Sequence, residues 1–319
     1  MTDIFPLEWI ARAEARIAPH IRVTPLTHDR DRGVYIKWEN RQVTGSFKAR
    51  GAFNKILSLE AWEQRLGIVA ASAGNHGQGV ALAGKLVGAP VTVFASQNAS
   101  PFKIDRMRAL GAEVRLVPGG YEQAEARGLR YAAENNKTWV SPYNDSQVIA
   151  GQGTIGLEIA RQMALTPEMT VLVPVSGGGL LAGIAAAIAG NAQPPKVVGV
   201  QAQASAFMHA LFTRDSQENV PDLPTLADGL AGPVEQGSIT IPLIKSMVED
   251  IILVSEEDIS RGVAIACHVY GETVEGAAAV GLAAMLTGKI KPPAVVVVSG
   301  GNILPEIHAR VCADYKEIV

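Results

Sequence analysis

Four short segments rich in glycine and serine carry the residues best suited to binding and transforming a charged ligand. They span residues 45–48, 72–76, 176–179 and 299–302. Each is expected to follow a strand, and ligands of open α/β sheets bind at the carboxyl ends of strands. We therefore predict that the four segments line one shared crevice.

The segment at residues 176–179 is predicted to bind a phosphate group. A β-branched run, residues 171–175, precedes it, and an apolar helix-forming run, residues 180–189, follows it. Glycines let backbone N–H groups converge on one point, and the N-terminus of the following helix adds partial positive charge. The segment lacks the Gly-Lys-Ser/Thr ending of a P-loop. A tight turn without a ligand is the alternative that these residues leave open.

Lys48 is the residue best suited to covalent chemistry. It follows Ser46 and Phe47 and begins a segment that is expected to be helical. A lone lysine is commonly a solvated surface residue. Beside a phosphate site, however, partial burial lowers the pKa of the amine and frees it to form a Schiff base.

The elements that must position these residues alternate between short strands and longer helices. Strands are expected at residues 67–71, 90–94, 112–117, 170–175, 196–200 and 294–299, and helices at 78–87, 101–110, 121–135, 154–163, 180–189, 256–270 and 275–286. This alternation is typical of βαβ units in parallel sheets with helices on both faces. The stretch 204–237 breaks the pattern and is expected to be irregular. We predict two α/β domains, the larger formed by residues 1–66 and 145–319 and the smaller by residues 67–144.

Composition argues against several other classes of protein. The chain has 319 residues, a net charge of -3 and two cysteines, Cys267 and Cys312. The near balance of charge gives no reason to expect a nucleic acid partner, and the apolar runs are too short to cross a membrane. No CxxC or Cys/His ligand spacing is evident, so no zinc motif or disulfide framework is expected. The N-terminus lacks the pattern of a signal peptide, and we expect a cytoplasmic protein.

Six motifs in order resemble those of the fold-type II pyridoxal-phosphate enzymes and, among these, the threonine/serine dehydratases, which are ammonia-lyases related to serine racemase. They lie at residues 45–52, 71–79, 148–154, 174–183, 227–229 and 253–302 and cover nearly the whole chain. The resemblance implies two doubly wound domains of the tryptophan synthase β type with the active site in the cleft between them. It also implies pyridoxal 5'-phosphate as the cofactor, a small amino acid as the substrate, and a homodimer.

The resemblance assigns a role to each site residue. Lys48 would hold the cofactor as a Schiff base and later act as the base at the substrate Cα atom. The phosphate cradle would be Ser176, Gly177, Gly178, Gly179 and Leu180. Phe47, Asn75, Gly229 and Glu275 would contact the cofactor ring, and Ser299 would meet its pyridine nitrogen. The substrate would contact Ser72, Ala73, Gly74, Asn75, His76 and Tyr143. A hydroxyl such as that of Ser299 need not protonate the pyridine nitrogen, and the weaker electron sink suits β-elimination.

Departures from the family pattern refine these expectations. Ala73 stands where serine racemases carry a second serine, and it has no proton to give, which favours a lyase. Residues 201–207 lack the carboxylates that bind magnesium or calcium in many relatives, so we expect no metal there. The chain ends about where the family's catalytic region does, and we expect no C-terminal regulatory domain.

The reaction predicted from the resemblance is dehydration and deamination of L-threonine or L-serine to a 2-keto acid and ammonia. Hydroxyaspartate or phenylserine as substrate, and serine racemase-like or threonine synthase-like chemistry, stay open as alternatives. A non-enzymatic phosphate-binding module would leave Lys48 dispensable. Residues 151–156 also match the dinucleotide pattern GxGxxG, so a nicotinamide-dependent dehydrogenase is a remote alternative, although no full strand precedes the pattern and no acidic residue ends the next strand.

Overall fold

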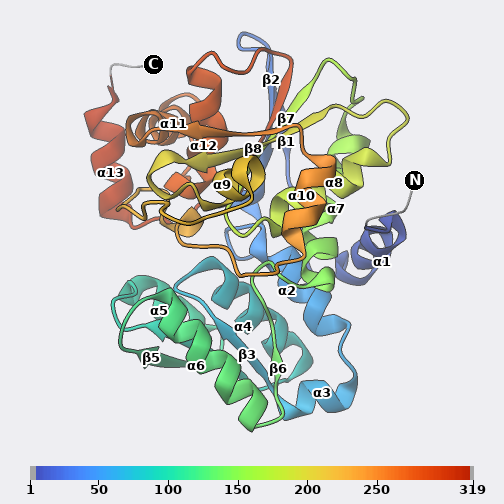
Figure 1. Ribbon diagram of the computed structural model, residues 1–319, viewed down its shortest axis with the longest axis vertical. Coiled ribbons are helices and arrows are strands. Elements are labelled where there is room, and N and C mark those ends of the chain that lie inside the picture. The colour runs from blue at the N-terminus through green and yellow to red at the C-terminus, as the bar shows by residue number, and fades with distance from the viewer. Residues whose placement is uncertain (1–4, 317–319) are drawn as a thin grey trace.

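The protein is built on two β-sheets, and the computed structural model describes residues 5–316 (Figure 1). The larger sheet contains β1 (Leu26–Asp29), β2 (Val34–Trp38), β7 (Thr170–Pro174), β8 (Lys196–Ala202), β9 (Asp250–Val254) and β10 (Ala294–Val298). Its strand order is β1-β2-β10-β7-β8-β9, and every neighbouring pair is parallel except the β1–β2 hairpin at one edge. All five residues of β10 are buried, as a strand covered on both faces requires.

Helices cover both faces of this sheet. One face packs against α7 (Ser146–Gln162), α8 (Gly179–Ala189), α9 (Phe207–Arg214) and α10 (Thr240–Met247). The other face packs against α11 (Glu256–His268), α12 (Gly276–Leu286) and α13 (Pro305–Asp314). The first helix, α1 (Leu7–Ile17), lies against α7. The two apolar layers therefore bury the sheet completely apart from its edges.

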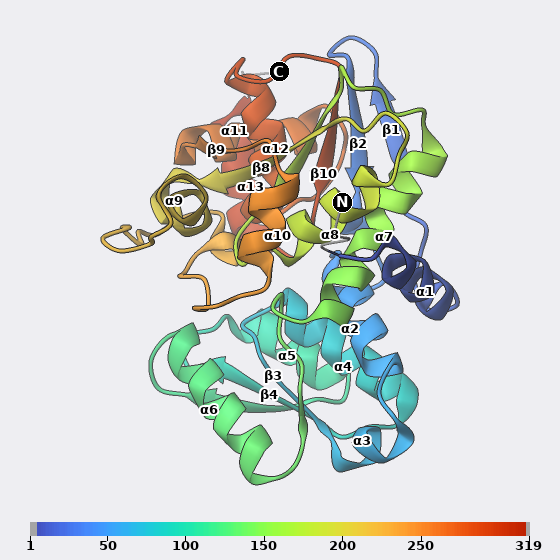
Figure 2. The ribbon, with the colours of Figure 1, turned by 45° about the vertical axis from the view of Figure 1, so that its right-hand side comes forward.

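The smaller sheet is all parallel and has the order β5-β4-β3-β6. Its strands are β3 (Ile68–Ala71), β4 (Val91–Ser96), β5 (Glu113–Val117) and β6 (Thr138–Trp139). On one side lie α2 (Lys48–Leu57), α4 (Asn75–Val87) and α5 (Pro101–Ala109), and on the other lies α6 (Tyr121–Glu134), while α3 (Ala61–Leu66) precedes β3. Figure 2 shows this unit below the larger sheet, with α2 at the junction. The predicted architecture of two parallel-sheet α/β units is confirmed.

The helix α2 contacts elements of both units. It packs against α4 of the smaller unit and against α7 of the larger one. The predicted domain boundaries fall between elements of the two sheets, but α2 lies on the larger-domain side of the boundary while its apolar face belongs to the smaller core. The exact division of the chain stays a prediction.

The predicted start of one helix was wrong in a way that bears on the GxGxxG pattern. The helix expected at residues 154–163 begins at Ser146, so the GxGxxG pattern at residues 151–156 lies wholly inside α7. A Cβ atom on Gly151 would stand 2.6 Å from the carbonyl oxygen of Arg50, which shows that this glycine permits close packing of α7 on α2. A dinucleotide-binding pattern needs its glycines in a strand-to-helix turn. The motif that supported a nicotinamide cofactor therefore has a structural explanation.

The stretch expected to be irregular contains helices. Besides α9 it holds the short 3-10 helices η2 (Gln203–Ser205) and η3 (Asp228–Leu230). The α9 helix forms because Phe207 and Met208 are buried against the larger sheet. Within residues 5–316, no helix has both the length and the apolar character that crossing a bilayer requires.

Candidate active site

Three of the four glycine- and serine-rich segments follow parallel strands, as predicted. Residues 72–76 follow β3, residues 176–179 follow β7, and residues 299–302 follow β10. The fourth does not, because β2 ends at Trp38 and the 3-10 helix η1 (Glu39–Arg41) and a loop separate it from Lys48. The segment reaches the others through an isolated antiparallel bridge between Ser46 and Gly300. The prediction that it follows a strand directly was wrong, but the bridge brings it to residues 299–302.

A chain of amide and carboxyl groups joins two of these segments, residues 72–76 and 299–302, to Glu275. Asn75 Nδ2 donates to Glu275 Oε1 at 2.6 Å, and Asn302 Nδ2 donates to Asn75 Oδ1 at 2.6 Å. A Cβ atom on Gly300 would stand 2.4 Å from Glu275 Oε1 and 3.0 Å from the Cβ of Ser46, so a side chain there would push the segments apart. Asn75 belongs to the smaller unit and the other residues to the larger one. The two units thus meet at these polar groups.

Lys48 lies at this meeting point as the first residue of α2. Its Nζ donates to the carbonyl oxygen of Pro142 at 2.9 Å and lies 5.1 Å from the centroid of the Phe47 ring. Burial lowers the pKa of Lys48 to about 8, although attraction to the Glu275 carboxylate opposes the shift. An amine with this pKa is partly unprotonated near neutral pH and is therefore available as a nucleophile or a base.

Glu275 is the acidic residue whose charge acts on Lys48. It lies at the position preceding α12 and is buried with only 5% of its surface exposed. Burial raises the pKa of Glu275 to about 7, against the opposing attraction of Lys103 and the hydrogen bond from Asn75. Near neutral pH this carboxyl group is consequently a mixture of its neutral and charged forms.

The predicted carboxylate site lies where β3 passes into α4. Ser72 Oγ accepts the N–H of Gly74 at 3.0 Å, and α4 begins at Asn75. The first N–H groups of a helix have no acceptor within the helix and attract anions. Ala73 is exposed at this turn. The geometry of the turn fits an anion such as an amino-acid carboxylate.

The ring of His76 is engaged elsewhere. Its Nε2 lies 2.9 Å from the carbonyl oxygen of Val140, so this nitrogen carries the proton. Burial, with a further contribution from nearby Lys48, lowers the pKa of His76 to about 3. The imidazole is neutral, and its Nε2 holds the loop after β6.

The predicted phosphate cradle lies between β7 and α8. Gly178 has φ of 91°, in the left-handed region that favours glycine. A Cβ atom on Gly177 would stand 2.3 Å from the ring of Tyr143, which packs against the cradle. The Tyr143 hydroxyl accepts the N–H of Glu235 at 2.9 Å, and this bond fixes the ring. Helix α8 begins at Gly179, so its N–H groups point out of the helix at the cradle.

These residues fit pyridoxal phosphate. The cradle has glycines where side chains would fill the space, and it has the helix N-terminus that a phosphate requires. Among residues 5–316, the buried hydroxyl of Ser46 finds no hydrogen-bond partner, which leaves a polar atom available beside Lys48. Ser299 is 3% exposed at the end of β10. Gly229 lies in η3, where an added Cβ atom would stand 3.2 Å from that of Ala277.

Sequence reasoning missed two cations on α5 that reach across the site. Lys103 Nζ lies 2.9 Å from Asp228 Oδ2, and Arg106 donates to Asn302 Oδ1 at 2.6 Å. Although burial acts to lower it, the Asp228 carboxylate raises the pKa of Lys103. The spacing of three residues places both cations on one helical face. The sequence shows this spacing, but it does not show which residues the helical face contacts.

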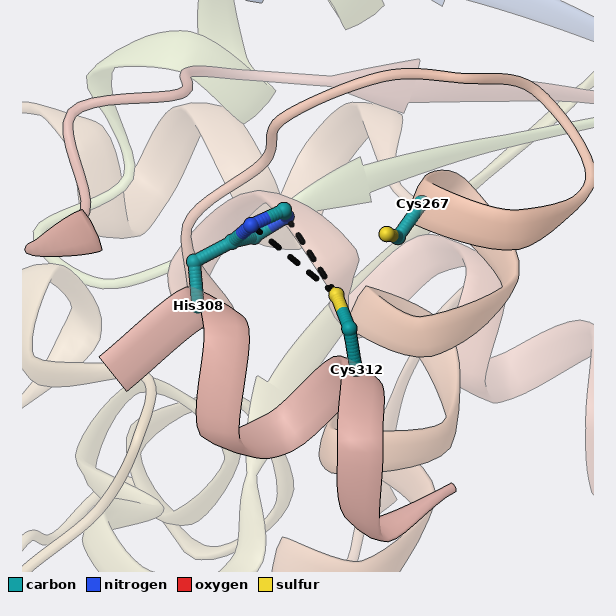
Figure 3. A group of neighbouring side chains, drawn as sticks. All are labelled: Cys267, His308 and Cys312. Carbon is teal, nitrogen blue, oxygen red and sulfur yellow. Dashed lines mark hydrogen bonds between the residues drawn. The ribbon is translucent and has the colours of Figure 1, made fainter. Parts of the chain in front are cut away.

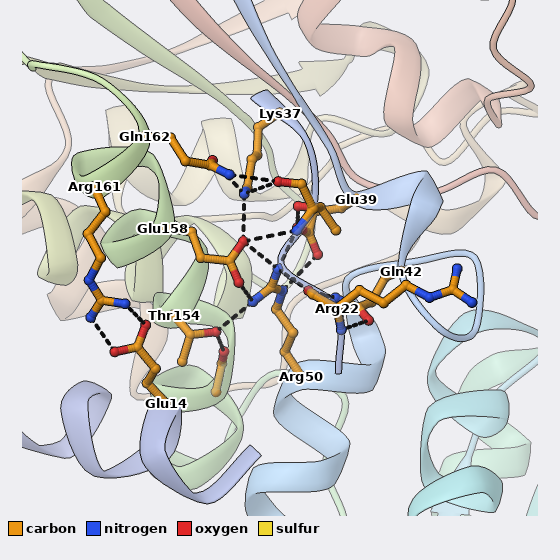
Figure 4. A network of polar contacts seen from close by, with 12 residues as sticks. Glu14, Arg22, Lys37, Glu39, Gln42, Arg50, Thr154, Glu158, Arg161 and Gln162 are labelled. Carbon is orange, nitrogen blue, oxygen red and sulfur yellow. Dashed lines mark hydrogen bonds and ion pairs between the residues drawn. The ribbon is translucent and has the colours of Figure 1, made fainter. Parts of the chain in front are cut away.

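A buried ion network links Arg50 of α2 to residues of the larger unit (Figure 4). Arg50 donates to Glu39 through Nε at 2.8 Å and to Glu158 through Nη1 at 2.7 Å, and Lys37 donates to Glu158 at 2.5 Å. Each of the four side chains is at most 6% exposed. Glu158 comes from α7 and Glu39 from η1. Two cations and two anions thus anchor the helix that carries Lys48 to the larger unit.

Comparison with known proteins finds relatives that match most of the chain. The chain is 44% identical over 273 residues to L-threonine ammonia-lyase of Thermotoga maritima. The alignment covers 85% of this chain and 67% of the relative. Among solved structures, maize serine racemase aligns with a TM-score of 0.89 at 28% identity and covers 98% of both chains. The processed form of threonine deaminase isoform 2 from Solanum lycopersicum aligns with a TM-score of 0.87 at 29% identity and covers 98% of this chain and 88% of that one.

The family model described as pyridoxal-phosphate dependent enzyme matches residues 15–301. The match includes Lys48, the cradle after β7 and Ser299, and the structure brings these together. The chain belongs to the family of pyridoxal-phosphate dependent enzymes.

Proposed function

We propose that the protein is an ammonia-lyase that removes water and ammonia from L-threonine, and also from L-serine, to give a 2-keto acid. The observation that carries the proposal is the Lys48 amine, with its pKa lowered to about 8, in one site with the glycine cradle. The relatives named L-threonine ammonia-lyase and threonine deaminase support threonine as the substrate. The roles of the site residues given below are part of this proposal.

Pyridoxal phosphate, when bound, supplies a conjugated electron sink that makes the Cα–H bond of an attached amino acid acidic. Residues 176–180 would bind its phosphate through backbone N–H groups. Asn75 would bind the ring hydroxyl, Ser299 would meet the pyridine nitrogen, and Phe47 and Gly229 would flank the ring. Because Ser299 carries a neutral hydroxyl, it does not force a proton onto that nitrogen.

Lys48 is the group that we assign as the base at the substrate Cα atom. Its amine is partly unprotonated near neutral pH, whereas His76, with a pKa of about 3, is too weak a base to compete. The first turn of α4 would hold the substrate carboxylate through N–H groups and so direct the Cα–H bond towards Lys48. The chain thus supplies one base on one side of the substrate.

The absence of a hydroxyl at Ala73 favours elimination over racemisation. A racemase must deliver a proton to the substrate face opposite its first base. Ala73 lies at the exposed turn before α4, and a methyl group neither gives nor accepts a proton. Racemisation is nevertheless the second candidate, because maize serine racemase has the same fold over 98% of this chain.

The test compares purified wild-type protein with Lys48→Ala, and uses Lys55→Ala on the same helix as a control. Lys55 forms an ion pair with Asp145 at 2.7 Å and takes no part in the proposed chemistry. Wild type and Lys55→Ala should show a cofactor absorbance band that borohydride reduces and should release 2-keto acid from L-threonine. Lys48→Ala should lose the borohydride-sensitive band and lower the rate by more than about 10³-fold.

Three results would overturn the proposal. They are a colourless wild type that pyridoxal phosphate does not reconstitute, full activity of Lys48→Ala, and conversion of L-serine to D-serine without keto acid. Comparing kcat/KM for threonine, serine, hydroxyaspartate and phenylserine then decides the substrate. A preference for either of the last two by more than about tenfold would replace threonine, since one methyl group changes binding by only about 1–3 kcal/mol.

We also propose that the enzyme is a cytoplasmic homodimer, on the ground of the family resemblance. Light scattering coupled to size-exclusion chromatography measures the assembly directly. A dimer should give twice the chain mass of 33.6 kDa. A particle of one chain mass at micromolar concentration would contradict it.

A further inference from the structure

Both cysteines of the chain and one histidine come together outside the proposed active site (Figure 3). Cys267 lies in the last turn of α11, and His308 and Cys312 lie one turn apart on α13. The possible ligand atoms of the three residues all lie within 4.8 Å of one another. The proposed elimination uses none of these groups.

The helices fix the geometry of this cluster. Residues four apart on a helix project from the same face, so His308 and Cys312 point towards α11 together. Cys312 Sγ lies 3.6 Å from His308 Nε2. In a tetrahedral zinc site, bonds of about 2.3 Å to sulfur and about 2.0 Å to nitrogen place these two atoms about 3.6 Å apart. The side chains therefore already stand at the separation of zinc ligands.

The chemistry of the donors selects the cation. Two sulfur atoms and one imidazole suit zinc, whereas magnesium and calcium require oxygen ligands. A disulfide between the two cysteines would account for the sulfur atoms but not for the convergence of His308. The backbone of Cys312 is held in place as well, because its carbonyl oxygen lies 2.8 Å from His268 Nε2. This contact ties the end of α11 to α13 at the position of Cys312.

Thiols bind zinc as thiolates, so the affinity of this site should depend on pH. Zinc must therefore displace protons from the thiols, and two protons pass to solvent for each ion bound by two thiolates.

We propose that Cys267, His308 and Cys312 bind one zinc ion, with water in the fourth position. The ion would join the C-terminal end of α11 to α13. The chain runs from α11 to Glu275, and α13 follows the segment that ends in Asn302. The zinc ion would thus cross-link two helices that neighbour active-site segments along the chain. It would stabilise the folded state, because a ligand that binds only the native protein raises its stability.

The test uses the complete cofactor-loaded protein, stripped of metal by a chelator and titrated with zinc and with cobalt(II) as a spectroscopic probe. We expect one zinc per chain by elemental analysis, visible cobalt d–d bands with thiolate charge transfer, and protection of both cysteines from a thiol reagent. Zinc should also raise the melting temperature. Affinity should increase with pH, because the thiols must lose protons.

Three substitutions remove one donor each: Cys267→Ser, His308→Gln and Cys312→Ser. Each should weaken zinc binding by more than about 100-fold and abolish the zinc-dependent rise in melting temperature, while keto acid production is unchanged. His209→Gln, on α9, is the matched control and should bind zinc like the wild type. Because Cys312 is buried and its variant could fold poorly, Cys267→Ser, at a half-buried position, supplies the decisive comparison.

Three results would overturn the proposal. One is a wild type that binds no zinc at micromolar concentration. Another is undiminished binding by both His308→Gln and Cys267→Ser. The third is that the two cysteines form a disulfide under mild oxidation and bind no zinc in the reduced protein. None of these outcomes bears on Lys48, so they are distinguishable from failure of the proposed elimination.

Discussion

Replacing Arg50 by methionine tests whether the buried ion network holds α2 in place. Methionine keeps most of the length of the side chain but removes the guanidinium group. Arg50→Met leaves the Glu39 carboxylate, which is 0% exposed, without its cation, and leaves Glu158 with Lys37 alone. Removing one partner of a buried ion pair leaves an uncompensated charge in a medium that solvates it poorly. The free energy of unfolding should therefore fall by about 3–5 kcal/mol.

Arg161→Met provides a control at an ion pair on the surface of α7. Arg161 pairs with Glu14 at the surface and is 63% exposed, so its loss should cost less than about 1 kcal/mol. Both variants make the same chemical change to an arginine, and only the burial differs. Equilibrium urea unfolding followed by tryptophan fluorescence measures the two costs, and Trp38, which precedes Glu39, reports on the neighbourhood. Equal, small losses in the two variants would refute the reasoning.

The same experiment has a predicted dependence on pH. Burial acts to raise the pKa of Glu158, but Arg50 and Lys37 lower it below its ordinary value of 4.5. A carboxyl group with a lowered folded-state pKa contributes stability that is present above the unfolded pKa and is lost as the pH falls through the folded pKa. Without Arg50, Glu158 keeps Lys37 alone as a cation that lowers its pKa. The difference in stability between wild type and Arg50→Met should therefore shrink as the pH falls below 4.5, where the wild type loses the contribution of Glu158.

Three further outcomes are expected. Gly177→Ala should weaken pyridoxal phosphate binding by more than about tenfold in equilibrium dialysis, because its Cβ atom would stand 2.3 Å from the Tyr143 ring. Tyr143→Phe leaves the Glu235 N–H without its hydroxyl acceptor and should reduce stability by about 1 kcal/mol in urea unfolding. In the cofactor-free protein, the raised pKa of Glu275 means that its contribution to stability is present below pH 4.5 and is lost as the pH rises through about 7. Glu275→Gln should abolish that decline, and an unchanged pH profile in the variant would contradict the assignment.

Parallel βαβ units explain why much of the fold and part of the site could be predicted. Strands such as β10 are buried on both faces, and their sequences are continuous runs of apolar residues, mostly valine in β10. The turns that follow parallel strands all lie at the same edge of the sheet. The N-terminal cap of α11 was equally predictable, since Ser255 and Asp258 form a capping box within four residues of sequence. Features set by local patterns could thus be read from the chain.

Features set by distant contacts could not. The bridge between Ser46 and Gly300 depends on which segments the two units bring together, and no local pattern records it. Arg106 reaches Asn302 because α5 sits above the loop after β10, which is a property of the docking of the units. The cysteine and histidine cluster escaped notice for a similar reason: its helical pair was visible as His308 and Cys312, but the third donor comes from another helix.

Two glycine-rich segments show most clearly what could not be predicted from the sequence. The pattern at residues 151–156 and the run at residues 177–179 look alike as possible phosphate loops. The structure separates them by the reason for the missing side chain. Gly151 faces the Arg50 carbonyl oxygen inside a helix, so it serves close packing, whereas Gly178 has a positive φ in a turn that opens on a helix N-terminus. Only the second arrangement directs backbone N–H groups towards a ligand, and that direction is set by backbone dihedral angles that the order of residues does not specify.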